Sequence, residues 1–137
     1  MNLAGIATGD LVWCNVGGRF FYARAAAPAE PGRLAVEPLS GGISYRSVPA
    51  RHVVGHFKAL ASTRDPRPGD LVYCAVEGEN DYARVEVPAL GRRRTGVVGL
   101  KAESGAPARP AEVLTLYRRM GRKRTREAGR EYASAPS

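Results

Sequence analysis

The sequence has little of what helical membrane proteins, secreted proteins and metal enzymes require. Its 137 residues include two cysteines, two histidines and one tryptophan. No stretch approaches the roughly 20 apolar residues of a bilayer-spanning helix. Residues 1–10 lack the basic start and apolar core of a secretory signal, so we expect none. With 44% hydrophobic and 25% charged residues, the composition predicts a folded protein that does not enter a membrane.

The residue patterns of catalytic and metal sites are also missing. Cys14 and Cys74 lie too far apart for a C-x-x-C pair, and two thiols alone do not complete a zinc site. His52 and His56 have the spacing of a helical metal pair, but the residues between them favour a strand. There is no G-x-S-x-G elbow and no phosphate-cradling G-x-x-x-x-G-K. The sequence therefore predicts no metal, no cofactor and no enzymatic activity, and it predicts buried thiols in a reducing compartment.

Basic residues are in excess, and nearly all of them are arginine. Lys and Arg number 21 against 13 Asp and Glu, which gives a net charge of +8 and a pI of about 10.1. Residues 1–60 carry +3, residues 61–117 carry 0, and residues 118–137 carry +5. A protein with this charge attracts polyanions such as nucleic acids.

Two segments of the chain repeat each other. Residues 9–24 (GDLVWCNVGGRFFYAR) align without a gap on residues 69–84 (GDLVYCAVEGENDYAR), and ten of the sixteen positions are identical. Trp13 is matched by Tyr73, a conservative exchange. We interpret the chain as a tandem duplication, and two copies predict paired domains because a solenoid needs at least three repeats.

Each copy has the pattern of short β-strands separated by glycine and proline turns. The runs are rich in valine and aromatic residues, and a glycine-containing hairpin turn joins the first two. So many short strands in roughly fifty residues fit a small closed barrel, which hides its strand edges. The predicted fold is all-β, with two tandem five-stranded barrels. We predict strands at residues 10–16, 20–27, 34–39, 43–48 and 52–57, and again at residues 70–76, 81–87, 96–100 and 112–117.

These elements divide the chain into four parts. The predicted barrels span residues 1–60 and 69–117, and the Pro-rich residues 61–68 form a short, fairly stiff linker. The linker predicts two barrels that pack together or hold a restricted angle. Residues 118–137 form a basic tail, which we expect to be disordered or to continue a helix that begins within residues 111–120.

The repeated segment resembles the opening of the Tudor and PWWP domains, which belong to the Royal superfamily of Src-homology-3-like barrels. The resemblance rests on GDLVWC at residues 9–14 and on FFYAR at residues 20–24. It covers about a third of each barrel. The family implies a non-enzymatic binding module for methylated lysine or arginine, or for DNA. By position, Phe21 resembles one member of the family's aromatic cage, whereas Asp81 replaces it in the second copy.

Low-specificity binding of DNA or RNA is the function that the charge pattern favours. A cluster of arginines binds phosphates by releasing counterions, without reading base sequence. The tail, a basic loop at residues 92–94 and the positive first copy would supply these contacts. The candidate residues are Arg19, Arg24, Arg46, Arg51, Arg92, Arg93, Arg94, Arg118, Arg119, Arg122, Lys123, Arg124 and Arg126.

A reader of methylated lysine or arginine in a protein segment is the second hypothesis, because a ring face attracts such cations. Alternation along the strand places Tyr22 and Arg24 on the same face. The pair could contact a ligand, with the Tyr22 ring stacking on it. Alternatively, Tyr22 packs at the barrel end and Arg24 forms an ion pair with Asp10 or Asp70. The aromatic residues could instead fill the barrel or the interface between the copies. The candidate rings are Trp13, Phe21, Tyr22 and Tyr45.

An adaptor that binds another protein, including an acidic segment, through its barrel edges is the third hypothesis. The expected localisation depends on the source of the protein. We expect a bacterial protein in the cytoplasm or at the nucleoid, and a eukaryotic one in the nucleus. A basic tail that serves only solubility or nuclear import is the alternative to phosphate contact.

Overall fold

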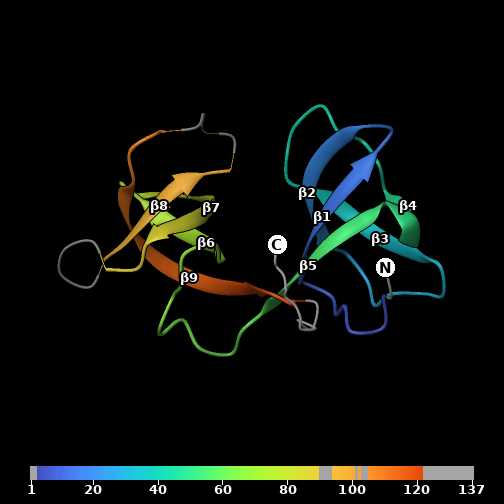
Figure 1. Cartoon of the computed structure of the whole chain (residues 1–137), viewed down its shortest axis with the longest axis horizontal. Helices are drawn as coiled ribbons and strands as arrows, with labels where there is room; N and C mark the ends of the chain where they lie inside the picture. The colour runs from blue at the N-terminus through green and yellow to red at the C-terminus, as the bar shows by residue number, and fades with distance from the viewer. Residues whose placement is uncertain (1–2, 90–93, 101, 103–104, 122–137) are drawn as a thin grey trace, which may run out of the picture.

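The computed structural model describes residues 3–89, 94–100, 102 and 105–121 of the chain. Within them the protein is all-β, and the predicted fold class is confirmed at that level. We call residues 3–60 the first half and residues 69–121 the second half (Figure 1). Besides the 3-10 turn η1 (Ala50–His52), the described strands are β1 (Leu11–Val16), β2 (Arg19–Ala25), β3 (Arg33–Pro38), β4 (Ser47–Pro49), β5 (Val53–Ala59), β6 (Leu71–Val76), β7 (Glu79–Val87), β8 (Thr95–Gly99) and β9 (Arg109–Arg119).

Five strands of the first half pair in the antiparallel order β4-β3-β2-β1-β5. The β1–β2 turn holds Gly17 and Gly18 at φ of 61° and 85°, a left-handed conformation that glycine adopts without strain. β4 is much shorter than the strand predicted at residues 43–48. The ladder ends at the Ala35–Ser47 pair, beyond which the Arg46 carbonyl accepts a hydrogen bond from the Val36 amide and the Tyr45 ring stacks on Phe21.

Four strands close a small barrel in the second half. β6 pairs with β7, β7 with β8, β8 with β9, and β9 again with β6. The prediction of five strands in each copy is therefore wrong for the second half of the described chain. β9 has eleven residues, so its start can pair with β8 and its middle with β6. This one long strand closes the barrel with four strands instead of the predicted five.

The helix predicted to begin within residues 111–120 is also wrong. These residues belong to β9, whose last three residues pair with β5 of the first half. A helix there would leave the edges of β5, β6 and β8 without partners, whereas one long strand satisfies all three. Arg118 and Arg119, which the sequence assigned to the tail, are therefore the last residues of the sheet.

The β5–β9 pairing joins the two halves into one continuous nine-stranded sheet (Figure 1). Its register pairs Phe57 with Arg119, Lys58 with Arg118 and Ala59 with Tyr117. Lys58 and Arg118 are sixty residues apart, which is the offset between the two aligned segments, so they are equivalent residues of the two halves. The pairing is thus centred on equivalent residues, as at a two-fold axis.

The strand registers of the two halves agree at this same spacing. Leu11 pairs with Arg24 in β1–β2, and Leu71 pairs with Arg84 in β6–β7. The β1–β5 and β6–β9 ladders each have an irregularity, after Trp13 and after Tyr73 respectively. The identical residues of the aligned segments therefore occupy equivalent positions in hairpins of equal register.

Three apolar clusters fill the described structure. Each half has an inner core, and one thiol lies in each, where burial raises the pKa to about 12 for Cys14 and about 11 for Cys74. The third cluster lies between the halves and contains Leu11, Phe57, Leu71 and Tyr117. Burial and the neighbouring Tyr82 raise the pKa of Tyr117 to about 12, so this phenol stays neutral. The outward faces of β1–β2–β5 and β6–β7–β9 are therefore buried against each other.

A buried aspartate precedes the first strand of each half. Asp10 accepts hydrogen bonds from the amides of Ala7 and Ala59 at 3.0 and 3.1 Å and from His56 Nε2 at 2.7 Å, with Lys58 Nζ at 3.6 Å. These contacts tie the start of β1 to the C-terminal part of β5.

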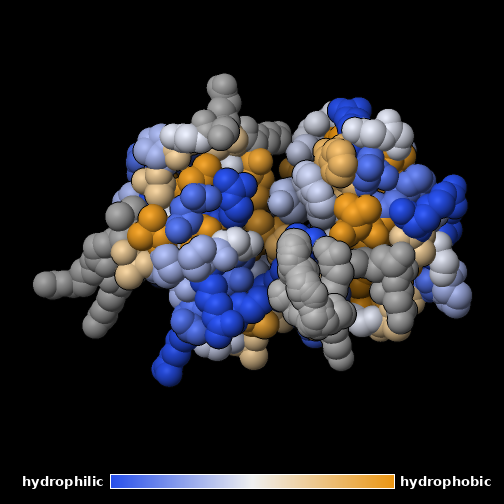
Figure 2. All heavy atoms as spheres, viewed as in Figure 1, coloured by the Kyte–Doolittle hydropathy of each residue, from blue (hydrophilic) through white to orange (hydrophobic). Residues whose placement is uncertain are grey.

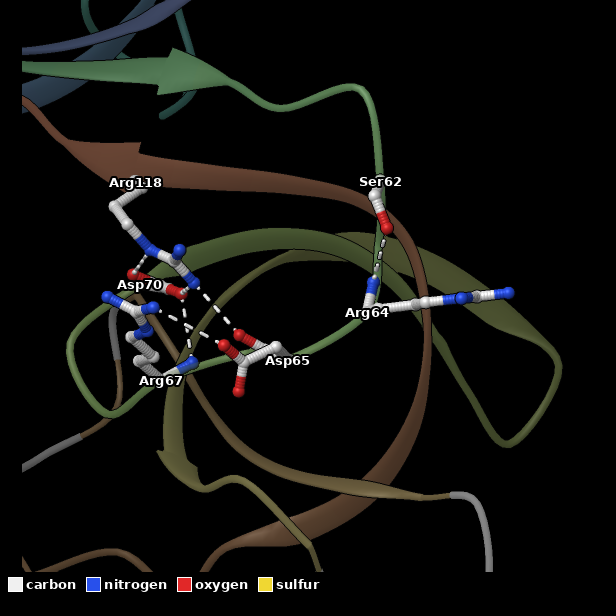
Figure 3. Close-up of polar contacts among 6 residues, drawn as sticks. All are labelled: Ser62, Arg64, Asp65, Arg67, Asp70 and Arg118. Carbon is white, nitrogen blue, oxygen red and sulfur yellow. Dashed lines mark hydrogen bonds and ion pairs between the residues drawn. The ribbon is translucent and has the colours of Figure 1, made fainter.

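Asp70 makes the equivalent contacts in the second half. It accepts from the Arg67 amide at 2.9 Å and from Arg118 Nη2 at 2.8 Å, and Arg118 also reaches the carbonyl of Asp65 (Figure 3). Hydrogen bonds to Asp70 raise the pKa of Arg118 above its ordinary value. The alternative in which Arg24 pairs with Asp10 or Asp70 is wrong, because β5 and β9 supply their cationic partners.

Replacing the buried carboxylate in Asp10→Asn should destabilise the fold and alter its pH dependence. Burial raises the pKa of Asp10, but the Ala7 amide, His56, the Ala59 amide and Lys58 together hold it below its ordinary 3.8. The ionised carboxylate therefore stabilises the fold fully above pH 3.8, and this stabilisation is lost as the pH falls below that value. We expect a loss of roughly 2–4 kcal/mol in the free energy of unfolding at pH 7.

Urea unfolding at pH 7 and pH 3 measures this effect. Glu112→Gln on the exposed side of β9 is the control and should change stability little. A gap between parent and Asp10→Asn that is as large at pH 3 as at pH 7 would contradict the assignment.

Candidate functional site

A groove of about 340 Å³ lies between the two halves, on the side of the β1–β2 and β7–β8 hairpins. The first half contributes an aromatic wall, and the described lining from the second half includes Asp81 and Tyr82. Several lining residues correspond at the sixty-residue spacing, such as Tyr22 with Tyr82 and Phe21 with Asp81. The described lining consists of Trp13, Phe20, Phe21, Tyr22, Leu39 and Ser40 from the first half, and Asp81, Tyr82, Gly99, Leu100 and Ala102 from the second.

The aromatic wall is built around Trp13. Its ring stacks on Phe20 with centroids 5.4 Å apart and an interplanar angle of 21°, and it contacts Tyr22 at 4.2 Å. Tyr22 in turn meets the edge of Phe57 at 6.0 Å, within the cluster between the halves. Phe20 remains 53% exposed, so the wall offers a ring face backed by a second ring.

The opposite wall is carried by β7, where Tyr82 faces the first half, while Asp81 pairs with the buried Cys74 and so has its side chain on the inner side of the strand. Asp81 is exposed, and its Oδ1 accepts a hydrogen bond from the Tyr82 amide at 2.7 Å. Tyr82 packs on Tyr73 at 4.9 Å and on Tyr117 at 6.3 Å, which fixes the backbone that carries Asp81. The described lining of the groove therefore combines aromatic and aliphatic side chains with polar groups.

The aromatic residues predicted from the sequence are only partly brought together. Trp13, Phe21 and Tyr22 all line the groove, but Tyr45 is not among its described lining residues. Phe21 is 3% exposed and lies in the inner core of the first half, where Tyr45 stacks on it at 5.7 Å. A cage of Phe21, Trp13 and Tyr45 is therefore not formed, since Phe21 shares the inner face with Cys14 under the exposed Tyr45 ring, whereas Trp13 pairs with Tyr22 on the opposite face.

Phe20 is the exposed groove-lining ring that sequence reasoning missed. Alternation along β2 could have identified it, because Phe21 shares its face with Ala23 and Ala25, which are buried. Phe20 must then share the other face with Tyr22. The aromatic character of both residues concealed this difference.

The basic candidates fall into three groups. Arg24 is ion-paired with Glu37 at 2.5 Å, Arg118 is bound to Asp70, and Arg119 lies over the Phe57 ring at 5.8 Å. Four others, Arg19, Arg46, Arg51 and Arg94, are exposed and have no ion pair with a described carboxylate. Outside the described residues lie Arg92, Arg93, Arg122, Lys123, Arg124 and Arg126.

Ion pairing divides the two halves electrostatically. In the second half and the segment before it, Arg67, Arg84, Arg109 and Arg118 each contact a carboxylate. In the first half, Arg33 bonds only the Ser47 hydroxyl, and Arg19, Arg46 and Arg51 have no described acidic partner. Figure 2 shows hydrophilic residues at the end of the first half that carries β3 and β4. The uncompensated positive charge of the described chain is therefore concentrated there.

The described residues hold no cluster of three or more histidine, cysteine, aspartate or glutamate side chains suited to a metal ion. Nor does any helix in the described part of the chain have the length and apolarity to cross a bilayer. Comparison with protein-family models, curated proteins and solved structures finds no match to this chain. The groove and the distribution of charge are therefore the features of the described chain that bear on its function.

Phe21→Ala and Phe20→Ala should separate the core ring from the exposed one. Loss of the buried Phe21 ring leaves a cavity in the first core, which should cost about 3–5 kcal/mol of unfolding free energy. Loss of the exposed Phe20 ring should cost under about 1 kcal/mol. Chemical denaturation of the two neighbouring variants measures both values, and equal losses would contradict the described orientation of β2.

Proposed function

We propose that this protein is a non-enzymatic binding module that holds nucleic acid with low sequence specificity. In this proposal the two halves are tandem Tudor-like barrels of the Src-homology-3-like type, and the first half carries most phosphate contacts. The observation that supports it is the set of exposed arginines in the first half, Arg19, Arg33, Arg46 and Arg51, which lack described carboxylate partners. A guanidinium without a counter-charge binds phosphate without first breaking an ion pair.

The placement of Arg118 changes the proposed role of the tail. Arg118 is held by Asp70 and by the carbonyl of Asp65, as Figure 3 shows, so it stabilises the sheet instead of contacting a ligand. Residues 122–137 still contain Arg122, Lys123, Arg124, Arg126 and Arg130. We therefore assign the tail's phosphate contacts to residues beyond Gly121.

The double variant Arg46→Ser/Arg51→Ser should weaken nucleic-acid binding and flatten its salt dependence. Removing two phosphate contacts lowers the slope of log K against log salt by about 1.4 for single strands and about 1.8 for duplex DNA. Fluorescence anisotropy with a labelled 20-nucleotide strand and its duplex, across a salt series, measures the slope.

The matched control is Arg84→Ser/Arg109→Ser, which removes the same charge from two ion-paired positions. We expect its slope to stay close to that of the parent, because Glu86 and Glu77 already compensate those arginines. Equal changes in the two variants would mean that net charge, and not the first half, determines binding. No binding of either nucleic acid at low salt would overturn the proposed function.

A chain that ends at Gly121 should bind more weakly and with a smaller slope than the full chain. Five basic residues are removed while β9 stays intact. If three of the five contact phosphates, the slope falls by about 2 to 3. The same anisotropy series measures the change, and an unchanged slope would assign the tail a role other than phosphate contact.

A further inference from the structure

We propose that the aromatic wall of the groove stacks one unpaired base on Phe20, with Arg119 as the phosphate contact beside it. This inference rests on the proposed function and specifies which form of nucleic acid the wall takes, namely a single strand. It is supported by the outward direction of the rings, by an open ring face, and by a guanidinium that has no described carboxylate partner.

Strand pairing puts the rings of this wall on one outward face of the first half. Trp13 pairs with Tyr22, and Phe20 shares the face of Tyr22 because it lies two residues away in β2. The opposite face of the same strands holds Cys14 and Phe21, which belong to the inner core. The three rings of the wall therefore point out of the barrel and toward the groove.

Phe20 offers the open ring face of this wall. The residue is 53% exposed, and its ring stacks nearly parallel on Trp13. One face of the ring is thus backed by Trp13, and the other is left for a ligand. Unpaired bases stack on such rings, whereas the bases of a duplex are already stacked on each other. The wall therefore favours single-stranded segments.

Arg119 brings a positive charge to the same face. It lies opposite Phe57 in the β5–β9 ladder, and its guanidinium stands over that ring at 5.8 Å. Gly55 leaves room for this placement, since a Cβ there would lie 3.7 Å from Arg119 Nη2 and 3.3 Å from the Cβ of Trp13. The missing side chain lets the guanidinium approach the aromatic wall.

The charge of Arg119 determines which kind of ligand fits the wall. Arg119 is exposed and has no ion pair with a described carboxylate. Burial raises the pKa of Tyr22, and the positive charges of Arg84 and Arg119 oppose that rise. The rings therefore lie in a positive local field, which attracts the phosphates of a strand and repels a cationic side chain. We favour the nucleotide over a basic or methylated peptide for this reason.

Three 20-nucleotide probes, titrated into the full chain at low salt, test the site. They are a thymine strand, its duplex with an adenine strand, and a strand that carries tetrahydrofuran in place of every base. Trp13 is the chain's one tryptophan and backs Phe20, so its fluorescence responds to a base on the wall. We expect the thymine strand to quench this fluorescence. The duplex and the abasic strand should bind without quenching it, because neither offers an unpaired base.

Phe20→Ala and Tyr45→Ala form the matched pair of ring variants. Both remove an exposed ring of the first half, but Tyr45 stacks on Phe21 and is not among the described lining residues of the groove. Phe20→Ala should bind the thymine strand about 5- to 150-fold more weakly, the range for one lost stacked base. Its affinity for the duplex and the abasic strand should stay within about twofold of the parent, and Phe20→Tyr should restore quenching. Tyr45→Ala should bind all three probes like the parent.

Arg119→Gln and Arg109→Gln test the phosphate contact. For the thymine strand, Arg119→Gln should lower the slope of log K against log salt by about 0.7, as expected for one lost contact. Arg109→Gln removes the same charge from the other end of β9, where Glu77 already compensates it, and should leave the slope unchanged. Equal slopes in the two variants would overturn the role of Arg119.

Distinct outcomes separate this inference from the proposed function. Parent-like binding of the thymine strand by Phe20→Ala, or equal losses in Phe20→Ala and Tyr45→Ala, would overturn the stacking site and leave general nucleic-acid binding intact. Dimerisation in gel filtration that Phe20→Ala abolishes, with no quenching by any strand, would assign the wall to a second copy of the chain. Failure to bind any of the three probes at low salt would overturn both proposals.

Discussion

The antiparallel pairing of β5 with β9 is the constraint on which the rest of the structure depends. It is centred on Lys58 and Arg118, and each of these cations also contacts the buried aspartate of its own half. One strand pair therefore fixes both the angle between the halves and the start of each first strand. Because the outward faces of the hairpins are brought together by this pairing, Leu11 and Leu71 become buried between the halves.

The groove follows from the same arrangement, and its asymmetry follows from the sequence differences between the halves. Two identical hairpins in equivalent positions would line the groove with identical walls. Here Phe20 corresponds to Asn80, and Phe21 corresponds to Asp81. The first change leaves the exposed aromatic face on one wall only, and the second places a carboxylate where the first half has a core ring. Divergence at these positions therefore makes the two sides of the groove different.

Local structure was predictable from the sequence to a greater extent than the contacts between strands far apart in the chain. The hairpins were predictable because alternation and glycine-containing turns are short-range signals, and the buried Cys14 and Cys74 followed from the same alternation. The length of β9 was not predictable from the sequence. A run that contains Glu112, Arg118 and Arg119 becomes a strand because the edges of β5, β6 and β8 need a partner. The groove was hidden for the same reason, because its walls meet only after β5 and β9 have paired.

Ion pairing, more than the number of arginines, determines where positive charge is left uncompensated in the described structure. The second half has many arginines, but most of those described contact a carboxylate, whereas the first half has fewer acidic groups within reach. Exposed ion pairs of this kind contribute little to stability. Their larger effect is to remove local positive potential from the half that carries Asp81. In the proposed function, a polyanion is therefore drawn to the first half and not to the second.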